Sequence, residues 1–187
     1  MIAVRDLDAA AASFRELGFT LTPRGRHSVG SENHCIMFAS TYIELLAAPT
    51  PHPWLDYYRT FLDSGDGLAA IALTTDDADA AYRALPAAKR PMDLSRPVEG
   101  GMARFRLVQL EDEPSVFVCQ HLTRELVWRP EWQRHANGAT ELAGISIPVQ
   151  KPLEGLPPNI EWGKPATLRI RGTANTAQAH GVRLVFD

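Results

Sequence analysis

Two stretches of the chain share one pattern of apolar and polar positions. Residues 2–11 read Ile-Ala-Val-Arg-Asp-Leu-Asp-Ala-Ala-Ala, and residues 71–81 read Ile-Ala-Leu-Thr-Thr-Asp-Asp-Ala-Asp-Ala-Ala. In each, a short apolar run that suits a strand leads into aspartates that can cap a helix. Such a repeat indicates two structural units of the same kind. We therefore predict that a strand followed by a helix occurs twice.

A β-hairpin is predicted after each of these helices. Its apolar runs are Cys35–Phe38 with Tyr42–Leu46 in the first copy, and Ala103–Leu110 with Val116–His121 in the second. Before the second hairpin, Ser95-Arg96-Pro97 and Gly100-Gly101 are typical of turns. Each copy thus reads strand, helix, strand, strand, strand.

The domain organisation follows from this order. A helix that begins at Pro53 and ends at Gly65-Asp66-Gly67 joins the copies. We expect a first unit over 1–50, a linking helix over 51–66, a second unit over 67–122, and a connection with a third β-rich segment over 123–187. The strands of that segment are predicted at Leu142–Val149, Ala166–Arg171 and Val182–Phe186. They form either an abbreviated third unit or an extra sheet beside the first two.

Composition narrows the class of protein. With 45% hydrophobic and 22% charged residues in 187, the chain reads as a soluble globular protein. A net charge of -3 and the lack of long basic runs argue against nucleic acid as a partner. No signal-peptide pattern follows Met1 and no long apolar stretch occurs, so we expect a cytoplasmic protein without a membrane partner. Cys35 and Cys119 lie in apolar runs and suit small buried residues.

Two paired units would enclose a concave space in which a small-molecule site can form. Glu44 alternates with apolar neighbours on its strand, and a carboxylate buried there without a partner would be costly. It therefore has a role in a pocket, pairs with a structural arginine such as Arg104 or Arg106, or lies at a solvated edge. Cys119 and His121 share one strand face, where His121 is a ligand, a general base or a structural residue.

Other polar residues have two interpretations each. Arg104 and Arg106 project from one strand face, where they suit a carboxylate or phosphate, or pair with Glu111, Asp112 or Glu113 across the hairpin. His135 and Asn137 lie in a turn that is either a structural corner or a substrate contact.

The remaining aromatic and basic residues are less specific. Trp128 and Trp132, with arginines around them, suit a pocket lip, a homodimer contact or packing over one end of the sheet. The histidines at 27, 52 and 180 lie among turn residues and are expected to be solvated.

Several strings together resemble the glyoxalase-like branch of the vicinal oxygen chelate superfamily, which includes bleomycin-resistance proteins and dioxygenases. They are residues 2–11, 42–46, 95–97, 103–107, 117–121 and 135–139, so the resemblance covers about residues 1–150. It implies an α+β fold in which paired βαβββ modules form a cupped mixed sheet, here with a short third β-rich segment. It also implies that Asn33 and His34, the latter on the face of Ile36 and Phe38, lie beside the cavity.

The metal enzymes of that superfamily take their ligands from the first and last strands of each module. The resemblance places Glu44 at one such position, and His121 or Cys119 at another. Ala69-Ala70 stands where the second module's first ligand belongs, and the corresponding histidine of the first module would fall before Met1. The pattern for a divalent metal is thus incomplete, and a tight metal site is not expected. The cofactor stays unassigned.

These features predict a protein that binds a small molecule in the cupped cleft. As an enzyme it would be a lyase, isomerase or dioxygenase, with Glu44 as the base or sole surviving ligand, His121 as its partner and Arg106 as the anchor for an anion. The alternatives are a non-catalytic protein that sequesters a drug or metabolite, and an interaction module whose cleft is filled by its own side chains. A carboxylate and an imidazole that share the cleft are expected to favour each other's charged form.

Overall fold

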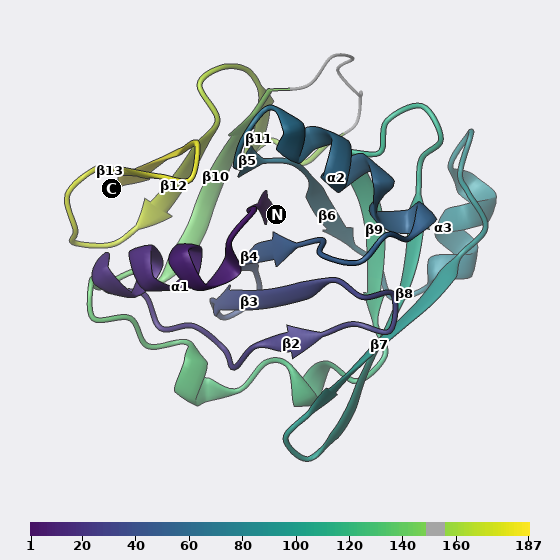
Figure 1. The fold of residues 1–187 in the computed structure, drawn as a ribbon, viewed down its shortest axis with the longest axis horizontal. Helices are drawn as coiled ribbons and strands as arrows, with labels where there is room; N and C mark the ends of the chain where they lie inside the picture. Colours follow the sequence, from purple (N-terminus) through teal and green to yellow (C-terminus); the bar gives the residue numbers. More distant parts are fainter. Residues whose placement is uncertain (149–155) are drawn as a thin grey trace.

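The computed structural model describes residues 1–148 and 156–187. The first copy of the sequence repeat lies in the first of two modules (Figure 1). Its elements are β1 (Ile2–Ala3), α1 (Leu7–Glu16), β2 (Gly25–Arg26), β3 (Glu32–Met37) and β4 (Tyr42–Ala47). They form a sheet in the order β2-β3-β4-β1, which β5 (Gly67–Leu68) extends beside β1. β1 runs parallel to β4, so the helix-containing crossover returns the chain to the same sheet.

The second module repeats this topology. Its elements are β6 (Ile71–Thr74), α3 (Ala78–Ala84), β7 (Met92–Val98), β8 (Gly101–Gln109) and β9 (Val116–His121). The sheet order β7-β8-β9-β6, with β6 parallel to β9, corresponds to that of the first module. The predicted pair of βαβββ units is therefore confirmed. Between them lie η1 (Pro53–Leu55) and α2 (Asp56–Asp63).

The repeated aspartates cap their helices as the sequence predicts. The Asp6 carboxylate accepts a hydrogen bond from the Ala9 amide at 2.9 Å, and Asp77 accepts one from the Ala80 amide at 2.9 Å. Each bond satisfies an amide that the first helical turn leaves without a partner. The aspartates that recur in the two sequence copies thus have the same role, which is to cap the N-terminus of a helix.

One part of the second module differs from the sequence prediction. The residues around Ser95-Arg96-Pro97 belong to β7 rather than to a turn. β7 is the edge strand of its sheet, where a proline can be accommodated because one side of the strand needs no hydrogen-bond partner. The turn between β7 and β8 is made by Glu99 and Gly100, and Gly100 has a φ angle of 90°.

Residues after the second module build a separate sheet. The connection contains η2 (Arg124–Leu126) and η3 (Pro130–Trp132), and the strands are β10 (Glu141–Ile147), β11 (Ile160–Trp162), β12 (Thr167–Arg171), β13 (Ala177–Ala179) and β14 (Val182–Phe186). Their order is β11-β10-β12-β14-β13. The third segment is an extra sheet with this order of its own, and the predicted strand end at Val149 lies outside the described residues.

Alternation along the strands divides the interior into two cores. On β3, Ile36 belongs to the core that also contains Phe14 of α1 and Leu168 of the third sheet. Its neighbours Cys35 and Met37 point to the other side, where the two modules meet. The same alternation sends Asn33 and Glu44 toward the space between the modules, and this face carries the candidate site.

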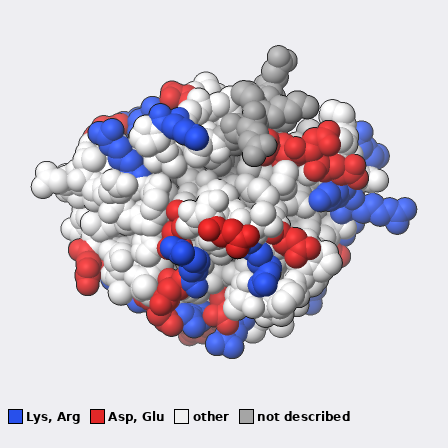
Figure 2. All heavy atoms as spheres, turned by 45° about the horizontal axis from the view of Figure 1, so that its top comes forward, with Lys and Arg blue, Asp and Glu red and all other residues white. Residues whose placement is uncertain are grey.

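Charged side chains of both signs are interspersed on the face shown in Figure 2. Among the described residues, no helix is long and apolar enough to cross a membrane.

Candidate functional site

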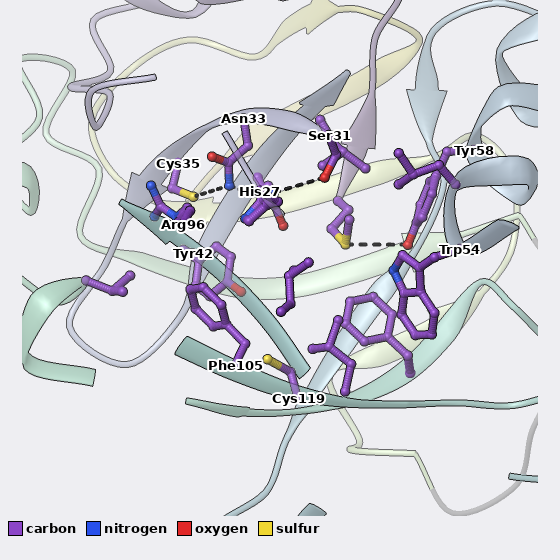
Figure 3. A pocket seen from close by; sticks show the side chains of 18 of the residues that line it. His27, Ser31, Asn33, Cys35, Tyr42, Trp54, Tyr58, Arg96, Phe105 and Cys119 are labelled. Atoms are coloured by element: carbon purple, nitrogen blue, oxygen red, sulfur yellow. Dashed lines mark hydrogen bonds between the residues drawn. The ribbon is translucent and has the colours of Figure 1, made fainter. Parts of the chain in front are cut away.

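A cavity lies between the two modules (Figure 3). Its polar lining comes from both modules, with Asn33 and Glu44 from the first and Arg96 and His121 from the second. Its apolar walls are Leu46, Leu55, Tyr58, Leu94, Phe105, Leu107, Phe117 and Val127. An apolar cavity with a few convergent polar groups is typical of a small-molecule site.

A second, larger cavity of about 250 Å³ shares part of this lining. The shared residues are Met1, Tyr42, Glu44, Cys119 and His121. The second cavity is also lined by apolar residues of β10, β11 and β12 in the third sheet. Glu44 and His121 therefore lie where the two cavities meet.

Glu44 is buried on β4 and is held by its neighbour on β3. The Asn33 side-chain nitrogen donates to Glu44 Oε1 at 2.6 Å. Burial raises the pKa of Glu44, while the Asn33 hydrogen bond and the nearby charges of the Met1 amino group and Arg96 act in the opposite direction. A carboxyl whose pKa is raised toward neutrality can exchange a proton with a bound molecule.

Arg96 on β7 is a buried cation whose guanidinium has no partner among the described residues. Its exposed fraction is 5%, and its Nε has no hydrogen-bond partner in the part of the chain that the structure describes. No ion pair joins Arg96 to any described carboxylate. The lining thus holds a permanent charge that the described residues leave unpaired.

The position of Arg96 depends on a glycine in the other module. A Cβ at Gly25 would lie 2.4 Å from Arg96 Nη1 and 2.4 Å from Asn33 Oδ1. Neither distance is compatible with the van der Waals radii of the atoms. Gly25 therefore leaves room for the guanidinium beside Asn33, whose Oδ1 is also buried without a hydrogen-bond partner in the described structure.

His121 is surrounded by aromatic rings. Its ring centroid lies 4.8 Å from that of Trp128, 5.0 Å from that of Phe105 and 5.9 Å from that of Tyr42. Burial, followed by the charges of Arg124 and Arg96, lowers the pKa of His121 to about 4. The imidazole is therefore neutral at neutral pH, and its buried Nδ1 has no hydrogen-bond partner among the described residues.

The expected mutual stabilisation of charged Glu44 and charged His121 is not found. Burial is the largest cause of both shifts, and it acts against the charged form of each group. Neither group is among the causes of the other's pKa shift. Their common electrostatic neighbour is Arg96, which favours ionisation of Glu44 and opposes that of His121.

The two cysteines line the cavity as thiols. Burial raises the pKa of Cys35 to about 12 and that of Cys119 to about 12. A thiol with such a pKa is a poor nucleophile at neutral pH, since the thiolate is the reactive form. Cys119 therefore contributes to the wall of the site and not to its chemistry.

Four of the sequence-predicted site residues meet in the cavity: Glu44, His121, Asn33 and Cys119. The two arginines do not. Arg104 is exposed, and Arg106 lies on the outer face, where its guanidinium pairs with Asp79 at 2.9 Å and with Asp93 at 2.7 Å. Arg106 is thus wrong as the anchor for an anion, and its acidic partners are not those predicted across the hairpin.

Three further predicted ligand contacts also lie elsewhere. His34 points to the opposite face of β3 from Asn33, with its Nδ1 2.7 Å from the Thr22 carbonyl oxygen. His135 Nε2 lies 3.0 Å from the Met37 carbonyl oxygen, and the Asn137 side chain donates to the Leu17 carbonyl at 2.9 Å. His135 and Asn137 thus fasten the connection after β9 to the first module, a contact that favours the structural interpretation of that turn, whereas His34 bonds within the first module.

The histidines expected in solvent are not free side chains. His27 is buried, lines the cavity and has its Nδ1 2.9 Å from Ser31 Oγ. Burial, followed by the charge of Arg96, lowers the pKa of His27 to about 3. His52 accepts a hydrogen bond from the Trp54 amide, and His180 Nδ1 lies 2.8 Å from Asp66 Oδ2.

Sequence reasoning missed Arg96 because the residues around it suggest a turn. In the hairpin register Arg96 faces Ala103, and Ala103 is fully buried. An arginine two residues from Leu94 on a strand face is the signal that could have identified it, once the edge strand was recognised.

The described residues do not make up a divalent-metal site. Glu44 and His121 line the cavity, but no group of three His, Cys, Asp or Glu side chains that could hold a metal ion occurs in residues 1–148 and 156–187. Ala69 and Ala70 offer no ligand at the position that the metal enzymes use. No chemical step is therefore assigned to a bound metal.

Fold and cavity together define a paired-βαβββ protein of the vicinal oxygen chelate class. The family model described as "Glyoxalase-like domain" matches residues 1–157. The chain belongs to this glyoxalase-like domain family.

Two solved structures are similar to this chain. A hypothetical protein from Staphylococcus aureus is 15% identical with a TM-score of 0.75, over 100% of this chain and 96% of the other. A methylmalonyl-CoA epimerase from Mycobacterium tuberculosis is 22% identical with a TM-score of 0.46, over 64% of this chain and 82% of the other. The first shows the fold alone. No curated protein matches the chain.

Proposed function

We propose that this protein binds a small organic molecule in the cavity between its two modules. One observation carries the proposal: polar atoms of Asn33, Arg96 and His121 are buried in one cavity without hydrogen-bond partners among the described residues. Buried polar groups are normally paired because desolvation without compensation costs about 1–3 kcal/mol for each neutral group. A ligand that supplies the missing partners removes that cost.

A screen by ligand-observed NMR tests the proposal on the full chain. The probe is a library of small neutral, cationic and anionic organic molecules. Binding molecules are expected to compete with one another and to perturb the amide signals of β3, β4, β7 and β9. Asn33→Ala is expected to weaken them, whereas Asn175→Ala, outside the cavity lining, serves as the matched control. Molecules that bind only at other surfaces would contradict the proposal.

A second candidate function is proton transfer at carbon by Glu44, as in an isomerase or lyase. The observation that favours it is a cavity carboxyl held by Asn33, whose raised pKa makes its ionised form a stronger base. Ionised Glu44 would take the proton from a carbon beside a carbonyl group, and the electron pair left behind would be delocalised onto the carbonyl oxygen. The protonated carboxyl would then return the proton to another carbon or to the same one.

Deuterium exchange separates this function from binding alone. In heavy water, the wild-type chain is expected to place deuterium beside the carbonyl of a ketone or keto acid that the screen finds in the cavity. Glu44→Gln should remove the exchange but retain binding of the neutral part of the ligand. Equal exchange rates in the variant and the wild type would exclude Glu44 as the base. Exchange by the wild type no faster than without protein would leave a non-catalytic binding protein.

A further inference from the structure

The guanidinium of Arg96 is buried, and no described residue neutralises its charge. A guanidinium stays protonated in proteins, so it cannot lose its charge as a buried lysine can. Buried charges are usually paired, because the cost of desolvating an ion reaches several kcal/mol. With an exposed fraction of 5% and no hydrogen bond or ion pair to a described residue, Arg96 is an exception that needs a counter-ion.

The lining itself does not supply that counter-ion. Glu44 is the one carboxyl among the lining residues, but it lies beyond ion-pair distance of Arg96 and is engaged by Asn33. Burial favours its uncharged form. His27 and His121 are neutral at neutral pH and so add no competing charge from the side chains around Arg96. The part of the cavity around Arg96 is therefore electropositive and suits an anion.

The adjoining cavity has a different character. Leu142 and Ile145 of β10, Ile160 of β11 and Leu168 of β12 line it opposite the first two sheets. Such walls stabilise apolar chains or rings by burying them. A molecule that reaches from Arg96 past Glu44 and His121 would enter this apolar space, because those two residues line both cavities.

We infer that the ligand is an organic monoanion, a carboxylate carrying an apolar chain or ring, with its carboxylate on Arg96 and its apolar part against the third sheet. This inference rests on the proposed function and specifies its ligand class. A guanidinium presents a planar fork that matches both oxygens of a carboxylate. One unpaired guanidinium beside a buried carboxyl suits a single negative charge better than the double charge of a phosphate monoester.

Calorimetry with octanoate, octanamide and octyl phosphate tests the class. The two C8 acyl compounds have nearly the same shape and differ in charge. Octanoate is expected to bind one molecule per chain, at least about 30-fold more tightly than octanamide, since loss of one partner of a buried charge pair typically costs 2–5 kcal/mol. Octyl phosphate is expected to bind more weakly than octanoate.

Arginine variants locate the charge contact. Arg96→Gln should reduce octanoate affinity at least about 30-fold and leave octanamide affinity nearly unchanged. Arg104→Gln is the matched control, because Arg104 is exposed on the neighbouring strand and outside the cavity lining. If Arg96→Gln does not fold, Arg96→Lys keeps the charge but loses the fork and should still weaken octanoate. The wild-type comparison of octanoate with octanamide needs no variant.

Chain length tests the apolar part of the inference. From butanoate to octanoate the affinity should rise about 3- to 4-fold per methylene, the effect of burying each CH₂. Leu142→Gln should reduce this increment, because it places a polar group on the wall of the second cavity. An affinity independent of chain length would overturn the placement of the tail.

The outcomes separate this inference from the proposed function. Equal affinities for octanoate and octanamide, tighter binding of octyl phosphate, or equal octanoate affinity in Arg96→Gln and Arg104→Gln would each overturn the inferred class. Cavity binding of other library molecules would then leave the proposed function standing. If wild-type protein binds none of the three C8 compounds, the inference fails, and the amide perturbations in the library screen decide the proposed function independently.

Discussion

Arg96 and Arg106 lie on neighbouring strands of one sheet and have opposite environments. Arg106, on the outer face of β8, pairs its two terminal nitrogens with Asp93 and Asp79, while its Nε has no partner in the described structure. Arg96, on β7, faces the cavity, and no described residue pairs with it. Among the described residues, two carboxylates pair with the arginine outside the cavity and none pairs with the one inside.

This difference separates a structural charge from a functional one. An arginine that only supports the fold is most stable when its partners are part of the same chain, as around Arg106. An arginine that receives a ligand must keep its donors free, even though the ligand-free protein is then less stable. The predictions below test this contrast, beginning with the largest expected change.

Acid should destabilise the fold through His27, which adjoins Arg96. Its folded-state pKa of about 3 lies below the ordinary 6.5, so the unfolded chain binds the proton more readily. Stability should therefore fall as pH decreases from about 6.5 toward 3, by on the order of 4 kcal/mol from this residue. Urea unfolding across that range should show a shallower decline in His27→Gln. An NMR titration of His27 near pH 6.5 in the folded protein would contradict the burial argument.

Arg96→Met should stabilise the ligand-free protein. The variant keeps an unbranched side chain but removes a buried charge that has no described partner, so the free energy of unfolding should rise by about 1–3 kcal/mol. The same variant should lose octanoate binding. Denaturant unfolding with and without octanoate measures both effects.

Arg106→Met is the matched control for Arg96→Met, and the expected change in stability has the opposite sign. It removes two ion pairs at partly exposed positions, so it should lower stability slightly and leave octanoate affinity unchanged. If both methionine variants changed stability in the same direction, the two arginines would not differ in the way proposed.

Gly25→Ala should weaken octanoate binding without altering Arg96 itself. The added Cβ would lie 2.4 Å from Arg96 Nη1, so the guanidinium must move. We expect about a tenfold loss of affinity by calorimetry, equivalent to about 1.4 kcal/mol. Gly163→Ala is the control, because a Cβ there meets only Ser146 Oγ, at 3.1 Å. Equal losses in the two alanine variants would show that the cavity is not specifically sensitive at Gly25.

Much of the fold could be predicted from local pattern. The aspartates at 6 and 77 start equivalent helices, and alternation in β3 and β4 places Asn33 and Glu44 on one face. These features depend on near neighbours in the chain, which the sequence displays directly.

The errors in predicting the site residues concern which face of the second module's sheet lines the cavity. Alternation along the strand shows that Arg104 and Arg106 share a face of the sheet. It does not show which face packs against the first module, because that depends on the tertiary structure. The sequence did not identify Arg96 as a site residue because the proline beside it is typical of turns. An edge strand, however, can accommodate that proline. Both errors arise from the arrangement of strands in the sheet.

Arginine side-chain NMR compares the two charges most directly. In a nitrogen-15 correlation spectrum, the Nε–H signals of Arg96 and Arg106 are assigned by their loss in Arg96→Gln and Arg106→Gln, and octanoate is then added to the wild-type chain. The Arg96 signal is expected to shift in proportion to bound octanoate, while the Arg106 signal stays in place. Octanoate binding that leaves the Arg96 signal unmoved would contradict the assignment of Arg96 as the anion anchor.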